Sequence, residues 1–132
     1  MDHAEIITKT INFVKDTLKN AKTAGVEHLI EFSVCDFEET EVPDAPGMVL
    51  FNPEYGERLG VHSKLEATYA RIGDFMKKKC LGYKGYIFTG NPDLAKKIGL
   101  RAARKIEFYN GKLDCRLLEY ELYEGSRRAP EE

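Results

Sequence analysis

The first 24 residues place apolar side chains at the period of a helix. These side chains are Ile7, Ile11, Val14, Leu18 and Ala21. Their spacing of three or four positions aligns them along one helical face, which predicts a helix over residues 2–24. Asp2 and Glu5 have the spacing of a capping box, and Gly25 suits the position just after a helix end. Because residues 5–8 include sheet-forming side chains, a short strand there is the alternative.

Two strands are predicted in the next part of the chain. Residues 28–35 alternate apolar and polar side chains from Ile30 to Val34, which is typical of a strand with one buried face. Residues 48–51 form a short, continuous apolar run, which suits a strand that is buried on both faces of a parallel sheet. The acidic residues 37–46 between them contain two prolines and predict a loop.

Two more helices flank a third strand. Ser63 forms a capping box with Glu66, and apolar residues at helical spacing follow it, so we expect a helix to begin at Ser63. Residues 86–89 are another short apolar run and predict a strand. Residues 91–92 are Asn-Pro, a typical helix N-cap followed by a proline in the first turn, and that helix should end near Gly99.

The pattern of the last third of the chain predicts a β-hairpin. Apolar residues alternate up to Phe108, residues 110–111 are the Asn-Gly pair of a type I′ turn, and residues 113–117 alternate back. The apolar phase then shifts over residues 118–122, which predicts a β-bulge. Strands separated by helices and followed by a hairpin indicate an α/β fold, with a parallel sheet extended by an antiparallel pair.

Length and composition fit one domain with its own core. The chain has 132 residues, and we expect a domain over residues 1–124 and a tail over residues 125–132. No apolar run approaches the roughly 20 residues of a membrane helix, and no signal peptide is visible. Three cysteines without a CxxC pair and three scattered histidines predict reduced thiols, a cytoplasmic location and no metal site.

The net charge of −2 conceals an uneven distribution of charge. Residues 1–60 carry 12 acidic and 5 basic side chains, whereas residues 61–132 carry 10 acidic and 15 basic ones. The simplest interpretation of the basic half is a set of solvated helix faces, and the functional one is a groove for an RNA backbone. The residues concerned are Lys77, Lys78, Lys79, Lys84, Lys96, Lys97, Arg101, Arg104 and Lys105.

Polar segments follow three of the predicted strands: Asp36, residues 52–55 and residues 89–91. Ligands of open α/β sheets bind beyond the carboxyl ends of the strands, so we expect these segments to converge. The carbonyl oxygens of Asn52 and Pro53 can accept hydrogen bonds from an exocyclic amine, and the ring of Tyr55 can stack on a base. A plain turn in which the tyrosine serves as packing is the alternative.

The segment FNPEYGERLG at residues 51–60 resembles the NPPYGERLG motif of the RNA methyltransferases that modify guanine N2 in large-subunit ribosomal RNA. Residues 20–32 and 81–123 also resemble segments of that family. The resemblance implies a Rossmann-like methyltransferase fold, S-adenosylmethionine as methyl donor and ribosomal RNA as substrate. Many of these enzymes also carry a THUMP RNA-binding domain.

The resemblance also implies roles for individual residues. By position, Asn52 and Pro53 would bind the target amino group, and Tyr55 would stack on the base. Asp36 would contact the adenine of the donor, with Asn52 also beside the donor. Arg58 and Lys84 would contact RNA. The simpler interpretations are that Asp36 caps a turn and that Arg58 forms a surface ion pair. The chemistry implied is direct methyl transfer.

This chain departs from the family pattern at three places. No glycine-rich donor loop of the GxGxG type occurs, so we expect a fold truncated at its N-terminus. Thr8 and Thr10 stand where the family has acidic residues that hold the donor ribose. Glu54 replaces the second proline of the motif and places an anion beside the site.

Two functional interpretations remain open. The chain is a C-terminal catalytic-domain fragment that needs its missing half, or it is an inactive relative that acts as an RNA- or protein-binding module. A purely structural or dimerisation domain is a third, weaker alternative. Because loss of a central strand leaves a sheet edge exposed, we expect a homodimer or a complementing N-terminal fragment as partner.

Overall fold

The computed structural model divides the chain into two compact units, residues 1–40 and residues 41–132. Each unit is described here by itself. The residues that the structure describes are 3–55, 62–111 and 113–124. The predicted boundary between a domain at residues 1–124 and a tail stays a prediction, because residues 125–132 lie outside the described ranges.

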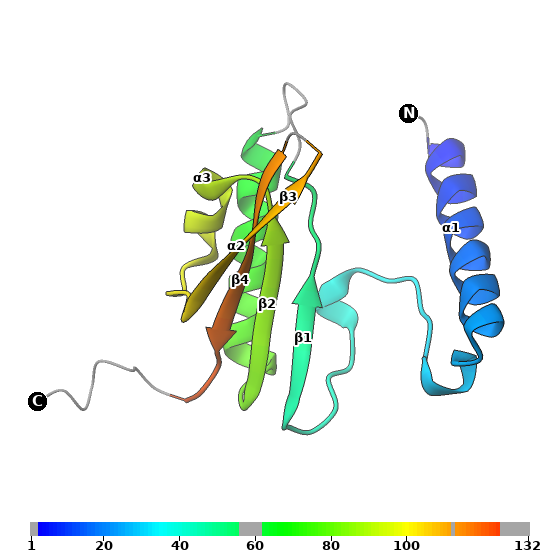
Figure 1. Cartoon of the computed structure of the whole chain (residues 1–132), viewed down its shortest axis with the longest axis horizontal. Coiled ribbons are helices and arrows are strands. Elements are labelled where there is room, and N and C mark those ends of the chain that lie inside the picture. Colours follow the sequence, from blue (N-terminus) through cyan, green and yellow to red (C-terminus); the bar gives the residue numbers. More distant parts are fainter. Residues whose placement is uncertain (1–2, 56–61, 112, 125–132) are drawn as a thin grey trace, which may run out of the picture. The chain divides into compact units, whose positions relative to one another are not determined.

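The first unit consists mainly of one long helix, α1 (His3–Ala24) (Figure 1). The helix ends where Gly25 adopts a left-handed backbone with φ of 76°, which confirms the predicted stop. Two short 3₁₀ turns follow, at Glu27–Leu29 and Phe37–Glu39. The long helix is therefore confirmed, and the alternative strand at residues 5–8 is wrong.

The strand predicted at residues 28–35 is wrong. A 3₁₀ turn occupies Glu27–Leu29, and residues 30–35 contain no strand. Ile30 and Val34, which should have faced a core, are 45% and 63% exposed. A strand requires a neighbour to complete its backbone hydrogen bonds, and none of the described strands pairs with this segment. The alternation of apolar and polar residues does not show whether a partner strand is present.

The second unit is built on a four-stranded sheet in the order β1-β2-β4-β3. Strand β1 (Gly47–Phe51) runs parallel to β2 (Tyr83–Thr89), with Phe51 opposite Ile87. Strand β4 (Leu113–Glu121) pairs antiparallel with β2 and with β3 (Arg104–Asn110). The predicted mixed sheet, parallel first and ending in an antiparallel hairpin, is confirmed (Figure 1).

Two helices pack on one face of this sheet. Helix α2 (His62–Lys79) begins before Ser63, so Ser63 is not the N-cap that its capping box predicted. Helix α3 (Pro92–Ala95) continues into a 3₁₀ turn at Lys96–Ile98. The core between helices and sheet includes Tyr69, Ile72, Met76, Ile87, Leu94, Ile98, Leu118 and Tyr120.

The cap predicted for α3 is confirmed. The side-chain oxygen of Asn91 accepts hydrogen bonds from the backbone N–H groups of Asp93 and Leu94, both at 3.0 Å. Pro92 follows in the first turn, and Gly99 ends the segment with φ of 77°. The loop after β2 is therefore held in one conformation by its own sequence.

Strand β1 lies at the edge of the described sheet. The sequence predicted that this strand would be buried on both faces, and that prediction is wrong. Val49 and Phe51 are half-buried on the helix side, where Phe51 meets Phe75 edge to face with ring centroids 6.1 Å apart. Met48 and Leu50 point to the other side and are 72% and 67% exposed. Among the residues that the structure describes, the apolar run thus has a paired strand on one edge and a packed helix on one face.

The hairpin is confirmed, but its details differ from the prediction. Asn110 pairs with Leu113, so Asn110 belongs to strand β3 and not to the turn. The predicted bulge is wrong, because both registers of β4 run without interruption. The apolar phase shifts because β4 is an inner strand, with Cys115 and Leu118 buried on opposite faces.

One acidic side chain of β4 is also buried. Glu119 is 6% exposed and accepts hydrogen bonds from Nε and Nη2 of Arg104, at 3.1 Å and 2.9 Å. This bonding, more than the nearby positive charge, holds the pKa of Glu119 below its usual range. The pair lies on the sheet face opposite α2 and fixes the start of β3 against β4.

None of the helices in the described parts of the chain is both long and apolar enough to cross a membrane.

Helix α2 lies directly against the 3₁₀ turn Lys96–Ile98 at Gly73. A Cβ atom added to Gly73 would lie 1.8 Å from the carbonyl oxygen of Ile98, a distance that backbone atoms cannot tolerate. Replacing Gly73 with alanine should therefore push the 3₁₀ turn away from α2. We expect Gly73→Ala to lower the free energy of unfolding by about 2 kcal/mol, measured by urea denaturation.

A matched change tests whether the cost arises from this contact. Ala67 is an exposed residue of the same helix, and Ala67→Gly should cost only about 1 kcal/mol through helix propensity. A Gly73→Ala protein that is as stable as wild type, or more stable, would contradict the packing described here.

Candidate functional site

The carboxyl ends of β1 and β2 lie side by side, because the two strands are parallel neighbours (Figure 1). Asn52 follows β1 directly and is exposed, so its amide is available to a ligand. Gly90 follows β2 in the same way. The sequence predicted that the segments after these two strands would converge, and the structure brings them together at one rim of the sheet.

Tyr55 fixes the segment after β1 against the end of β2. A Cβ atom on Gly90 would lie 2.7 Å from Cε2 of the Tyr55 ring, so only glycine leaves room for this contact. The Tyr55 hydroxyl lies 3.6 Å from Sγ of the buried Cys115 on β4. Residues 52–55 therefore extend across the end of β2 towards β4, and the ring is half-buried rather than free in solvent.

Thr89 and Asn91 support this rim and are engaged in internal hydrogen bonds. Thr89 is 2% exposed, its hydroxyl lies 2.7 Å from that of Tyr69, and it accepts a hydrogen bond from the Asn91 N–H at 3.2 Å. Burial raises the pKa of Tyr69, with the Thr89 hydrogen bond opposing the shift, so the phenol is neutral near pH 7. These residues position the loop and leave Asn52 as the exposed polar group.

Asp36 belongs to the first unit, and there it caps a turn. Its carboxylate accepts a hydrogen bond at 3.0 Å from the backbone N–H of Glu38, at the start of the 3₁₀ turn Phe37–Glu39. This is the simpler role that the sequence offered for it. The contact between Asp36 and the adenine of a methyl donor stays a prediction.

The two predicted RNA contacts have different outcomes. Arg58 lies outside the described residues. Lys84 is exposed near the amino end of β2, opposite Met48 on β1 and Glu121 on β4. It is five residues before Thr89, so roughly 16 Å of strand separates it from the rim that carries Asn52. Its role as an RNA contact stays a prediction, and it would be a contact away from the methylated base.

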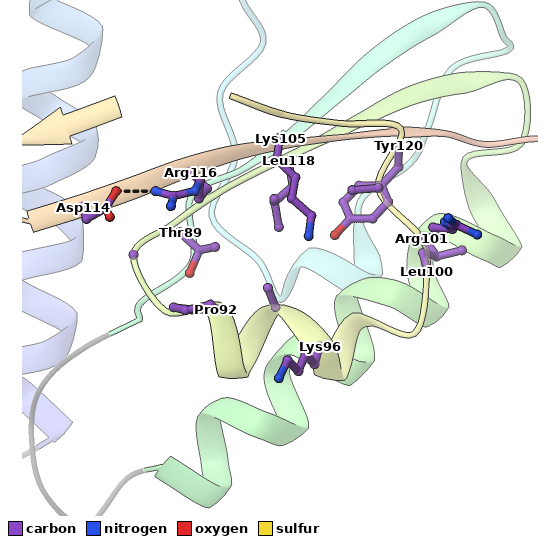
Figure 2. Close-up of a pocket in the computed structure, with 13 residues that line it drawn as sticks. Thr89, Pro92, Lys96, Leu100, Arg101, Lys105, Asp114, Arg116, Leu118 and Tyr120 are labelled. Carbon is purple, nitrogen blue, oxygen red and sulfur yellow. Dashed lines mark hydrogen bonds and ion pairs between the residues drawn. The ribbon is translucent and has the colours of Figure 1, made fainter. Parts of the chain in front are cut away.

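The sequence analysis did not identify a cavity of about 870 Å³ between α3 and the hairpin (Figure 2). Arg101, Lys105 and Arg116 line it, together with Tyr120 from β4. The signal was present in the sequence: residues two apart in a strand share a face, which places Arg116 beside Leu118 and Tyr120. Burial raises the pKa of Tyr120 to about 12, so this wall of the cavity is uncharged.

The described residues include no group of three or more His, Cys, Asp or Glu side chains that could hold a metal ion. The chain has no glycine-rich loop of the GxGxG type, and the ring of Tyr55 occupies the space beside Gly90. The residues described here therefore form a polar rim and do not by themselves form a cradle for S-adenosylmethionine.

Sequence comparison shows what this chain is similar to. Residues 7–119 match the family described as the RMKL-like methyltransferase domain. The ribosomal RNA large subunit methyltransferase K/L of Syntrophotalea carbinolica is 40% identical over 115 residues, which are 84% of this chain and 16% of the relative. The protein of the same name from Allochromatium vinosum is 36% identical over 113 residues. The chain thus spans about one sixth of the length of these relatives.

Structural comparison agrees. SMU.472, a protein of the methyltransferase class crystallised with SAH, matches with a TM-score of 0.75 at 25% identity, over 86% of this chain and 30% of its own. A possible methylase from Clostridium difficile 630 matches over the same shares with a TM-score of 0.75 at 30% identity. The predicted α/β fold of the Rossmann-like methyltransferase type is confirmed.

The contact between Tyr55 and Gly90 is testable by a double-mutant cycle. Gly90→Ala places a Cβ atom against the ring of Tyr55, and we expect it to lower the free energy of unfolding by about 1–3 kcal/mol. In a Tyr55→Ala background the same change should cost little, because the ring is no longer there. Urea denaturation of the four proteins gives the coupling energy. Additive effects, within about 0.5 kcal/mol, would show that the two residues do not touch.

Proposed function

The chain belongs to the RMKL-like methyltransferase domain family, and from this we propose that it forms the acceptor side of an S-adenosylmethionine-dependent methyltransferase acting on guanine N2 of large-subunit ribosomal RNA. The observation that supports this best is the exposed Asn52 amide, presented at a rim that Tyr55 and Gly90 hold in place. The names of the curated relatives supply the substrate class.

Asn52 and Pro53 would orient the acceptor amine. The guanine N2 amine has two N–H donors, and the side-chain oxygen of Asn52 and the backbone oxygen of Pro53 are two acceptors in adjacent residues. Bonds to both hydrogens leave the nitrogen lone pair as the free position and increase its electron density. The sulfonium donor would supply an electrophilic methyl carbon: the new N–C bond would form as the S–C bond breaks, the thioether would leave with the bonding electron pair, and the amine would release one proton to solvent.

Tyr55 would hold the base in place during this step. Its ring is anchored through Gly90 and Cys115, so it offers a fixed surface on which a base can stack without a large loss of side-chain freedom. A guanine in a helix must leave its stack to reach such a site. Glu54 is exposed in the same segment, and its charge would keep phosphates away from this point.

The donor side would come from another polypeptide segment, and β1 is where it would join. Strand β1 contains none of the lysines or prolines with which edge strands avoid pairing, and Met48 and Leu50 are exposed beside that edge. A parallel strand added there would complete the backbone hydrogen bonds and cover both side chains. We favour a complementing segment that carries the glycine-rich donor loop over pairing of two copies of this chain, because the chain has no such loop.

Methyl transfer tests the role of Asn52. We expect the chain complexed with a complementing segment to transfer methyl groups from radiolabelled S-adenosylmethionine to ribosomal RNA. Asn52→Ala should lower kcat about 100-fold or more, because the acceptor amine loses a hydrogen-bond partner that orients it. Asn20→Ala, at an exposed position of α1, is the matched control and should have no effect.

Three outcomes would contradict the proposal. Undiminished transfer by the Asn52→Ala protein would remove that residue from the site. Tight binding of S-adenosylmethionine by the chain alone, measured by calorimetry, would show that the donor cradle lies within this chain. RNA binding without methyl transfer in the complemented complex would favour an inactive binding module, for which Glu54 in place of the second proline already provides a reason.

The β1 edge can be tested by gel filtration with light scattering. We expect Met48→Lys with Leu50→Lys to weaken association with the complementing segment about tenfold or more, because the introduced charges would have to be buried. Both side chains are exposed, so the thermal midpoint of the isolated chain should change little. Leu29→Lys, at a site that is 73% exposed in the first unit, is the control. If the wild type, the Met48→Lys/Leu50→Lys protein and the Leu29→Lys protein all associate equally well, the β1 edge is not the binding site of the complementing segment.

A further inference from the structure

The cavity beside α3 is large enough for a ligand and is not used by the proposed methyl transfer. Its volume of about 870 Å³ lies in the range of small-molecule sites. The loop after β2, the segment around α3, and strands β3 and β4 enclose it (Figure 2). The residues that line it are Thr89, Gly90, Pro92, Ala95, Lys96, Leu100, Arg101, Ala102, Lys105, Asp114, Arg116, Leu118 and Tyr120.

The lining of this cavity is strongly positive. It has four basic side chains and a single carboxylate, that of Asp114, which forms an ion pair with Arg116. Arg116 also lies 3.7 Å from Glu107. In Figure 2 the Asp114–Arg116 pair lies at one end of the cavity and Arg101 at the other, with Lys105 between them. Negative protein charge therefore gathers at one end only.

The other cations remain available to a ligand. Lys96 has only a long ion pair with Asp93, at 3.9 Å, and its side chain is 79% exposed, so solvent screens the interaction. Among the residues that the structure describes, Arg101 and Lys105 form no ion pair. Two unneutralised cations thus face the same concave space from different elements, the loop after Gly99 and strand β3.

The remaining walls strengthen the field of these cations. Leu100, Ala102 and Leu118 are apolar, and Tyr120 is buried, which raises its pKa to about 12 and keeps its phenol neutral well above pH 7. Apolar walls keep the local dielectric low, so a concave site with one sign of charge concentrates counter-ions. The small residues Gly90, Ala95 and Ala102 in the lining leave space where larger side chains would fill the cavity.

The cavity begins where the acceptor rim ends. Thr89 and Gly90 line it, and Gly90 is also the residue against which Tyr55 packs. We propose that this cavity binds backbone phosphates of the RNA strand whose base is held at Asn52, at nucleotides beyond those that flank this base, with Lys105 and Arg101 as the principal contacts. That the anion belongs to RNA rests on the proposed function, whereas its phosphate chemistry follows from the cavity itself.

RNA fits these observations better than an acidic protein segment does. A strand whose base is held by Asn52 and Tyr55 necessarily carries a phosphate on each side of that base. Thr89 and Gly90 line the cavity and also belong to the rim, so a strand that continues from the rim along the cavity passes Lys105 and then Arg101, whereas the exposed Glu54 makes the segment after β1 unfavourable for phosphate. An acidic peptide has no comparable reason to extend into the cavity from the rim.

Direct binding of RNA to the full chain tests the proposal. A fluorescently labelled, short single-stranded RNA containing guanine is titrated with protein, and anisotropy is measured from about 50 to about 200 mM salt. Arg101→Ala with Lys105→Ala should weaken binding about tenfold and reduce the slope of log K against log salt by about 1.4, the value for two phosphate contacts on a single strand. Both side chains are exposed, so the fold should be retained, which circular dichroism can verify.

Two control proteins separate this site from general charge. Lys78→Ala with Lys79→Ala removes the same charge from the last turn of α2, outside the cavity, and should change the affinity much less. Arg101→Lys with Lys105→Arg keeps the charge and should restore binding. Equal losses for the two charge-removing proteins would overturn the proposal, as would an unchanged affinity of the Arg101/Lys105 variant. Displacement of the RNA by an acidic peptide as effectively as by unlabelled RNA would also overturn it.

This experiment distinguishes a failure of the cavity from a failure of the proposed function. Asn52→Ala should leave most of the phosphate affinity intact, because it removes only a base contact. If Asn52 is required for methyl transfer but the Arg101/Lys105 variant binds RNA normally, the cavity inference is wrong and the function stands. If RNA binding depends on the cavity but no complemented complex transfers methyl groups, the cavity inference stands and the proposed methyl transfer is wrong.

Discussion

Parallel pairing of β1 with β2 is the interaction on which the rest of the second unit depends. It sets Phe51 opposite Ile87, so the segments that follow β1 and β2 leave the sheet at the same rim. Because of this register, Asn52 is exposed at the rim, and Tyr55 packs against Gly90 and crosses the end of β2 to reach Cys115. An antiparallel pairing of the same two segments would place their polar ends at opposite edges. The polar rim is thus a consequence of strand direction.

The sheet also explains why this chain is suited to a partner. Helices α2 and α3 cover one face, while Met48 and Leu50 remain exposed on the other, next to an edge of β1 that pairs with none of the described strands. The length of chain that the relatives have beyond the matched region is much larger than the part shared with this protein. The proposed acceptor rim, the proposed phosphate-binding cavity and the β1 edge would together form one side of a larger catalytic site.

Local sequence signals predicted most elements of the fold, and tertiary context decided where they failed. Asn91-Pro92 predicted its helix start correctly because a cap depends only on neighbouring residues. The strand at residues 28–35 failed because alternation cannot supply a pairing partner, and β1 was predicted to be buried on both faces because an apolar run cannot show which edge is free. Asn110 was predicted to lie in the turn but belongs to β3, since its pairing with Leu113 set the register. At the site, a motif identified Asn52, Pro53 and Tyr55. The cavity was not predicted, because the residues that line it come from four segments and no single stretch of sequence contains enough of them.

The site depends above all on the segment after β1 lying against the end of β2. Nuclear magnetic resonance measures this contact directly, through nuclear Overhauser effects between the ring protons of Tyr55 and the α protons of Gly90 in the folded chain. We expect strong effects between these protons, together with inter-strand effects between Phe51 and Ile87 that report parallel pairing. A folded chain that shows the β2–β4–β3 effects but none between Tyr55 and Gly90 would contradict it.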